Sequence, residues 1–116
     1  MFVKAEDLIV KTSDNACGGE GTMIAKHLTD KAGLYNHGRM FAHVILPPGV
    51  SVGEHSHFNE TDFYYVIKGE AVLTDNGKEI IMHAGDLAYA SHGESHAIAN
   101  RSDKNMEMIC LIETEV

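Results

Sequence analysis

Two histidines separated by a single residue, His55 and His57, stand in a segment whose composition favours a β-strand. Side chains two residues apart point to the same face of a strand, so both imidazoles are offered to one side. With this spacing a strand supplies two nitrogen ligands to one metal ion, and neutral imidazole suits Zn, Fe, Ni or Cu. The pair therefore predicts half of a metal site, whereas the ordinary alternative is a polar strand whose histidines are only solvated.

Three further side chains are candidates to complete this site. Glu60 and Asp62 follow His57 within five residues, and His96 belongs to a later segment. Carboxylate oxygen widens the choice of metal to Mn. Three imidazoles and one carboxylate leave open positions on a six-coordinate ion, as a catalytic or ligand-binding site requires. We expect one divalent transition metal, which is Fe, Mn, Ni or Zn.

The segment 39–46 offers two candidates for the ligand pocket. Strand alternation puts Arg39 and His43 on one face, together with Phe41 and Ile45. Because the planar fork of an arginine binds carboxylate or phosphate at two points, Arg39 is a candidate for holding a ligand. The alternatives are a surface arginine at a strand end and, for His43, a core histidine bonded to a neighbour.

Tyr64 and His92 are the remaining pocket candidates. Tyr64 shares the face of Asp62 if the strand is regular, so its hydroxyl is expected near the metal, with core packing as the alternative. His92 precedes His96 by four residues and sits in a predicted turn. It either lines the entrance to the site or is a solvated loop histidine.

Short apolar segments bounded by turn residues must position these side chains. Asn76-Gly77, between two such segments, is the strongest signal of a two-residue hairpin. No window sustains a helical period over three turns, although 4–11 could form one short helical turn. The pattern predicts an all-β sandwich or barrel, and nothing within 1–116 marks a domain boundary. The predicted strands are 22–28, 39–46, 50–57, 62–68, 70–74, 78–83, 86–90, 95–100 and 106–113.

The length and the net charge limit the number of domains and the kinds of partner that the protein can have. A chain of 116 residues with 44% apolar and 22% charged residues suits one compact domain. Nine Lys and Arg oppose seventeen Asp and Glu, giving a formal net charge of −8, which disfavours nucleic acid and anionic lipid as partners. No apolar run approaches the roughly 18 residues of a membrane helix. The first residues show no signal-peptide pattern, so we expect a cytoplasmic protein.

The two cysteines, Cys17 and Cys110, form no CxxC pair. Neither a thiol redox motif nor a cysteine-rich zinc site is therefore supported. Two free thiols in a reducing compartment are expected instead.

Two stretches resemble the conserved motifs of the cupin family. Residues 49–69 follow G(X)5HXH(X)3–4E(X)6G at every fixed position, except that Asp62 stands where the family has Glu. Residues 85–100 follow G(X)5PXG(X)2H(X)3N, with Ser91 in place of Pro. The spacer 70–84 resembles that of the shortest single-domain bacterial cupins. The resemblance implies an all-β, single-domain jelly-roll β-barrel over 1–116.

The resemblance also implies a ligand set. His55, His57 and His96 take the three histidine positions, and Asp62 takes the position of the glutamate ligand. Asp is one methylene shorter than Glu, so its oxygen reaches less far toward the metal from the same backbone position. Glu60 is the second choice for this position, and a water in place of both carboxylates is the third.

Function is not chosen by the fold, because proteins that resemble cupins include enzymes and binding proteins. The first hypothesis is a metal-dependent enzyme, an oxygenase or isomerase, that acts on a small oxygen-rich metabolite such as a carboxylate or an enol. The second is a non-catalytic module that binds or senses such a molecule, and the third is a metal that only stabilises the fold. Open coordination positions favour the first hypothesis.

The segment 62–68 is apolar on both faces, with Tyr64 and Val66 alternating with Phe63, Tyr65 and Ile67. A half-buried strand needs only one apolar face, so something must cover the other. We expect a homodimer packed through this outward face.

Overall fold

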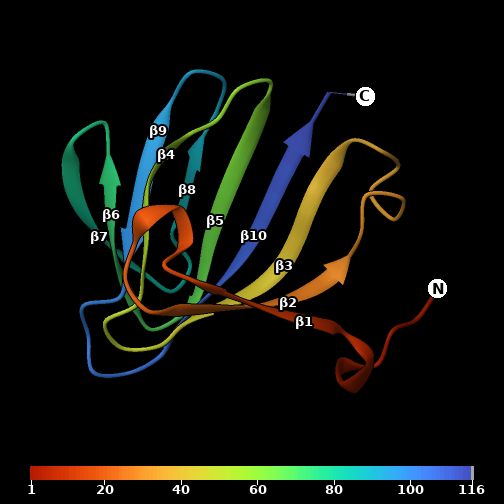
Figure 1. The fold of residues 1–116 in the computed structure, drawn as a ribbon, viewed down its shortest axis with the longest axis horizontal. Helices are drawn as coiled ribbons and strands as arrows, with labels where there is room; N and C mark the ends of the chain where they lie inside the picture. The colour runs from red at the N-terminus through yellow and green to blue at the C-terminus, as the bar shows by residue number, and fades with distance from the viewer. Residues whose placement is uncertain (116) are drawn as a thin grey trace.

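The computed structural model describes residues 1–115 and consists of strands joined by short connections (Figure 1). Two short 3-10 turns, η1 (Ala5–Asp7) and η2 (Ala16–Gly18), lie near the N-terminus. The strands are β1 (Ile9–Asp14), β2 (Thr22–Thr29), β3 (Gly38–Leu46), β4 (Ser51–Ser56), β5 (Glu60–Lys68), β6 (Glu70–Asp75), β7 (Lys78–His83), β8 (Leu87–Ala90), β9 (Ser95–Ala99) and β10 (Met106–Thr114).

The strands form two antiparallel sheets that face each other across the core (Figure 1). One sheet has the order β1-β2-β3-β10-β5-β8, and the other has the order β4-β9-β6-β7. No backbone ladder between described strands joins the two sheets, so the expected closed barrel is wrong. Each sheet keeps its own edges, and this two-layer arrangement fits a jelly roll.

Alternation of side chains along the strands builds the core. In β10, Met106, Met108, Cys110 and Ile112 are all buried, with less buried residues between them. β3 follows the same rule through its last five residues, 42–46. Because successive strand side chains point to opposite faces, these inward sets meet between the sheets and exclude water.

The predicted hairpin at Asn76-Gly77 is confirmed. Both residues have positive φ, 50° and 76°, as a type I′ turn requires. β6 and β7 pair directly on either side, with Asp75 opposite Lys78. The nine predicted strands are present, with ends that differ by at most two residues.

The N-terminal segment differs from the expectation. The helical turn expected within 4–11 is limited to η1, and β1 follows at once. All six residues of β1 are exposed, and the strand is held by its pairing with β2. Because β1 buries no side chain, its sequence carries no apolar alternation by which it could have been found.

A bulge in β4 decides which way its histidines point. Val52 pairs with Ile98, and His55 pairs with His96, so β4 has one residue more than β9 between these two pairs. Val52 is buried, and strict alternation would send His55 to the opposite face. The extra residue reverses the alternation and turns both histidines inward.

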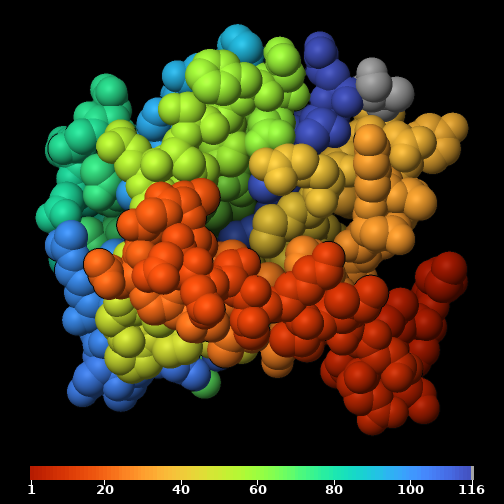
Figure 2. Space-filling model, viewed as in Figure 1, coloured from red at the N-terminus to blue at the C-terminus, as the bar shows by residue number. Residues whose placement is uncertain are grey.

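The segment that contains η2 packs on the outer edge of β4. The amide of Ser51 donates to the carbonyl of Glu20 at 2.9 Å. A Cβ on Gly19 would lie 2.2 Å from the Ser51 oxygen, and one on Gly53 would lie 2.2 Å from the Cys17 oxygen. Only glycine permits this backbone contact at both positions. Figure 2 shows the segment lying across the middle of the face turned to the viewer.

The predictions about membrane helices and about the two cysteines can be compared with the structure. Within residues 1–115 the structure has no helix long and apolar enough to cross a membrane. Cys17 is exposed, Cys110 is buried, and both are free thiols, as expected.

Candidate metal centre

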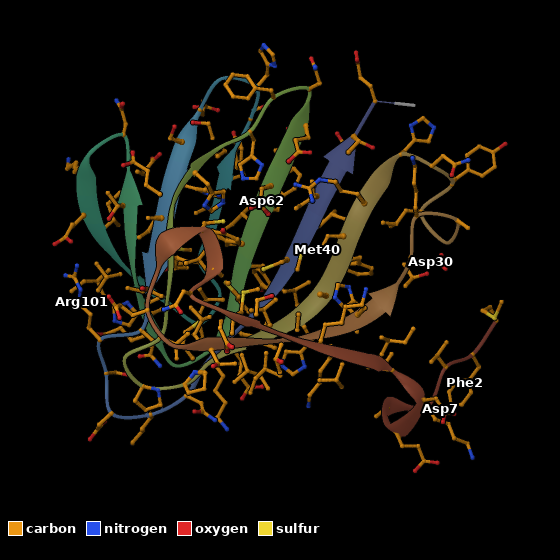
Figure 3. The ribbon with its side chains drawn as sticks, in the orientation of Figure 1. Phe2, Asp7, Asp30, Met40, Asp62 and Arg101 are labelled. Carbon is orange, nitrogen blue, oxygen red and sulfur yellow. The ribbon has the colours of Figure 1, made fainter. Side chains whose placement is uncertain are left out.

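Four side chains converge between the two sheets, and all belong to the predicted ligand set. His55, His57, Asp62 and His96 each place one ligand atom within 4.8 Å of the others. The Nε2 atom of His96 lies 3.1 Å from that of His55 and 3.2 Å from that of His57. The three histidines come from β4, the residue after it, and β9, whereas Asp62 comes from β5 in the facing sheet, where Figure 3 shows it in the interior.

Two of the rings are oriented by acceptors behind them. The Nδ1 atom of His55 donates to the carbonyl oxygen of Gly53 at 2.7 Å. The Nδ1 atom of His57 donates to Oε2 of Glu60 at 2.6 Å. A neutral imidazole that donates through Nδ1 keeps its lone pair on Nε2, so both rings present a ligand atom to the centre. The histidine spacing did not predict this contact of Gly53, although a glycine inside a strand pattern signals a bulge.

The donor set fits a divalent metal ion. Oδ1 of Asp62 is buried and has no hydrogen-bond partner among the described residues. Its other oxygen, Oδ2, lies 3.2 Å from Nε2 of His57 and of His96. Burying a carboxylate oxygen without a partner beside converging imidazole nitrogens costs folding free energy. A cation bound between these atoms removes that cost. The methylene that Asp62 lacks relative to Glu does not keep it out of the cluster.

The electrostatics of the two carboxylates differ. Burial works to raise the pKa of Asp62, but hydrogen bonds and charge from the surrounding histidines outweigh it, so this pKa lies below its usual value. Hydrogen bonding from Arg39 lowers the pKa of Glu60 to about 2 against the opposing effect of burial, and His57 adds to the lowering. Both carboxylates are therefore ionised at neutral pH.

Tyr64 lies beside the cluster, on the face that the alternation predicts. Its ring stacks on that of His96 with a centroid separation of 4.5 Å, and its hydroxyl lies 3.4 Å from Nε2 of His55. Burial, together with the charge of Asp62, raises the pKa of Tyr64 well above its usual value. Its hydroxyl therefore keeps its proton and can donate a hydrogen bond to an oxygen ligand in the centre.

Arg39 and His43 do not share a face, which corrects the expectation from alternation. In the ladder with β10, Gly38 and Met40 are paired, and Arg39 is the extra residue of a bulge. Arg39 turns to Glu60 and binds both of its oxygens at 2.8 Å. His43 stays on the outer face of the sheet, where its Nε2 lies 2.7 Å from Glu107. The structure therefore gives His43 a partner away from the cluster.

His92 is an exposed loop residue that holds a neighbouring loop. Its Nδ1 accepts the backbone amide of Asn59 at 2.8 Å, and its ring packs edge-on against Phe58. With Glu60 and Ser91 it borders a shallow hollow of about 340 Å³. None of the four residues of the cluster lines this hollow.

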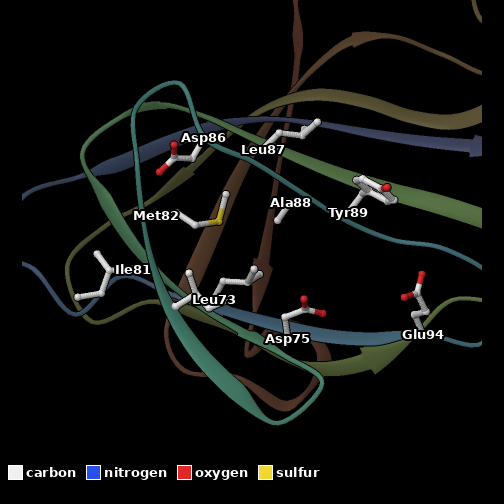
Figure 4. Close-up of a pocket in the computed structure, with 10 residues that line it drawn as sticks. Leu73, Asp75, Ile81, Met82, Asp86, Leu87, Ala88, Tyr89 and Glu94 are labelled. Atoms are coloured by element: carbon white, nitrogen blue, oxygen red, sulfur yellow. The ribbon is translucent and has the colours of Figure 1, made fainter.

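A second hollow, of about 490 Å³, lies between the β6–β7 hairpin and β8 (Figure 4). Leu73 and Met82 line one side of it, and Leu87, Ala88 and Tyr89 of β8 line the other. None of its ten lining residues belongs to the histidine cluster. This hollow marks the gap between the edges of β7 and β8, where the two sheets do not join.

The fold and the site together define a β-rich jelly roll that carries three imidazoles and a carboxylate between its sheets. A family model described as "Cupin domain" matches residues 42–112, more than half of the chain. The chain therefore belongs to the cupin family, as the two motifs predicted.

Relatives and solved structures agree with this assignment. An oxalate-binding protein of Thermotoga maritima is 38% identical over 112 residues, which cover 97% of this chain and 93% of that protein. A crystal structure from Thermotoga maritima, of a protein described as a predicted oxalate decarboxylase, is similar with a TM-score of 0.94 and 37% identity over 99% of this chain and 100% of that one. A sugar phosphate isomerase of Silicibacter pomeroyi matches with a TM-score of 0.81, covering 99% of this chain and 76% of that one. Its 22% identity shows the fold alone.

Proposed function

We propose that this protein binds a small dicarboxylate of the oxalate type at a divalent metal ion held by His55, His57, Asp62 and His96. The observation that carries the proposal is the convergence of these four ligand atoms within 4.8 Å, with one buried oxygen of Asp62 left without a partner. The similarity to an oxalate-binding protein over nearly the full length of both chains supports the choice of ligand.

The charge of the site suits an anionic oxygen ligand. Three neutral imidazoles and one carboxylate leave a divalent ion with a net positive charge, and burial strengthens its attraction for an anion. Four protein ligands leave two positions on a six-coordinate ion, which two oxygens of one dicarboxylate can fill. When bound, the metal supplies Lewis acidity to such a ligand. The Tyr64 hydroxyl can donate a hydrogen bond to one of the ligand oxygens.

The residues around the cluster favour binding of the dicarboxylate without its chemical conversion. Decarboxylation requires a group that returns a proton to the carbon left behind. Glu60, the carboxylate next to the cluster, is ionised, with a pKa of about 2, and its oxygens are engaged by Arg39 and His57. A carboxylate held in this way is a poor proton donor.

The test is a titration of the metal-loaded protein with oxalate, with acetate as a one-carboxylate control. By mass action, oxalate at 100 times its Kd should add about 2.7 kcal/mol of stability and raise Tm, whereas acetate should have a much smaller effect. The His96→Ala variant should lose the response. If oxalate at millimolar concentration leaves Tm unchanged, the ligand class is wrong. Release of CO2 or consumption of O2 would replace the binding function by an enzymatic one, as in the oxygenase hypothesis.

We also propose that the outer face of β5 and β8 packs against a second copy of the chain. This face carries four exposed apolar side chains: Tyr65, Ile67, Leu87 and Tyr89, which are 41–58% exposed. Tyr65 lies directly opposite Leu87 in the ladder, so the side chains form one continuous patch. Apolar patches of this kind are typical of interfaces between subunits.

The homodimer is tested by light scattering at micromolar concentration. We expect twice the chain mass of 12.7 kDa, and we expect Ile67→Glu to shift the protein to the monomer. Val10→Glu is the control, because Val10 is also an exposed aliphatic residue, 55% exposed against 41% for Ile67, and lies on β1 at the opposite edge of the sheet from β8. A monomeric wild type, or a dimer that both variants keep, contradicts this interface.

A further inference from the structure

A continuous chain of hydrogen bonds leads from the edge of the site to one of its histidines. The guanidinium of Arg39 donates through Nε and Nη2 to the two oxygens of Glu60, each at 2.8 Å. Oε2 of Glu60 also accepts the Nδ1 proton of His57 at 2.6 Å. His57 and Glu60 are largely buried, whereas the side chain of Arg39 is 53% exposed.

We propose that Glu60 is a positioning residue, held by Arg39, that orients His57 for metal binding and is not itself a ligand. The proposal rests on the proposed metal centre but not on the identity of the molecule bound there. It settles the choice between Glu60 and Asp62 that the sequence leaves open.

The geometry excludes Glu60 from the ligand set. The cluster whose ligand atoms lie within 4.8 Å contains Asp62 and not Glu60. Glu60 contacts His57 through Nδ1, the nitrogen on the side of the ring opposite to the one facing His96. Both Glu60 oxygens already accept charged or short hydrogen bonds, so a turn toward the centre would break them.

Arg39 fixes the orientation of the Glu60 carboxylate, which a single hydrogen bond to His57 would not do. A carboxylate that accepts a single hydrogen bond from an imidazole can rotate about its side-chain bonds and take the ring with it. A two-point contact with a planar guanidinium fixes the plane of the carboxylate. The bulge in β3 at Arg39 aims the guanidinium across β10 toward β5, where regular alternation would have kept it with His43 on the outer face.

The experiment compares zinc affinity, measured by chelator competition, for the wild type, Glu60→Ala, Glu60→Gln and Arg39→Lys. Loss of an outer partner of a metal-bound histidine typically lowers metal affinity by about 10–100-fold, and we expect Glu60→Ala in this range. Glu60→Gln keeps the side-chain size and should lose less, and Arg39→Lys, which replaces two contacts by one, should lose least. Glu79→Gln is the matched control, because Glu79 forms the same two-point pair with Arg101 on an exposed surface.

A second readout separates orientation from a general loss of structure. Long-range nitrogen–proton NMR spectra of the zinc-loaded protein report which ring nitrogen of His57 carries the proton. We expect Nδ1 in the wild type, and we expect the signal of that proton to broaden or vanish in Glu60→Ala while circular dichroism stays unchanged.

Three results would overturn the proposal. The first is wild-type zinc affinity in Glu60→Ala, and the second is a His57 ring protonated on Nε2. The third is a Glu60→Ala variant that loses zinc as completely as His57→Ala while Asp62→Ala retains it, since Glu60 would then be the ligand. A wild type that takes up no divalent metal would overturn the metal centre itself, and the spectrum of the metal-free protein would still decide whether Glu60 holds Nδ1 of His57.

Discussion

Replacing His96 by alanine is expected to abolish specific metal binding. The Nε2 atom of His96 is within 3.2 Å of Nε2 of His55, Nε2 of His57 and Oδ2 of Asp62, so its removal takes away the most central ligand atom. Loss of a residue that hydrogen-bonds to a metal ligand typically lowers metal affinity by about 10–100-fold. Loss of a direct ligand should lower it by more than about 100-fold. Chelator competition with zinc measures the affinity, and the rise of Tm on adding zinc should vanish with it.

His83→Ala is the matched control for this variant. His83 is an exposed histidine of β7 whose Nε2 lies 3.3 Å from Glu70, and it is not part of the cluster. It should bind zinc as the wild type does. Because Tyr64 stacks on His96, circular dichroism of the metal-free variant must show an intact fold before the affinities are compared. Zinc affinity within a few-fold of the wild type in His96→Ala would contradict the assignment of the site.

Replacing Asn100 by alanine is expected to cost about 3 kcal/mol of the free energy of unfolding without changing the metal ligands. Asn100 is 1% exposed, and its Nδ2 donates to the carbonyls of Leu46 and Lys104, each at 2.7 Å. Its Oδ1 accepts the backbone amide and the hydroxyl of Ser102. The alanine removes the side-chain donor to the Leu46 carbonyl and opens a cavity beside it, and both effects lower stability.

Urea denaturation of the metal-free protein measures this loss. Asn105→Ala is the matched control, because Asn105 is an exposed asparagine five residues away and should change stability by less than about 0.5 kcal/mol. A change below about 1 kcal/mol in Asn100→Ala would mean that water replaces the amide at this position. Asn100, the last residue of the second cupin motif, would then not have the structural role that these contacts indicate.

Local chemistry in the sequence was sufficient for most of the strands. The apolar runs ending in turn residues predicted nine of them. Strands such as β3 and β10 bury one face, and this burial requires the alternation that makes a strand visible, whereas β7 buries only Met82. Asn76-Gly77 predicted its hairpin because few other residue pairs accept positive φ at two successive positions. β1 was missed because it buries nothing and depends on β2 for its conformation.

The sequence also predicted which side chains converge and their order along the chain. The HxH spacing and the match to two cupin motifs were sufficient to select His55, His57 and His96, and Asp62 was ranked above Glu60. The direction in which the histidines point was not contained in the alternation, since Val52 inward puts His55 outward. The bulge between them turns the histidines inward, and it arises from pairing with β9, which is more than 40 residues away along the chain.

Only the tertiary structure determined which contacts Glu60 and Arg39 make in the site. In the sequence, Arg39 was a free cation suited to a ligand, and Glu60 was a second choice as a metal ligand. β10 lies between the strands that carry them, and the bulge in β3 brings the guanidinium to the carboxylate behind His57. A contact between residues on two strands that are not adjacent in the sheet leaves no periodic signal in one sequence. Sequence therefore determined which groups are available for chemistry here, and long-range strand pairing determined which of them reach the centre.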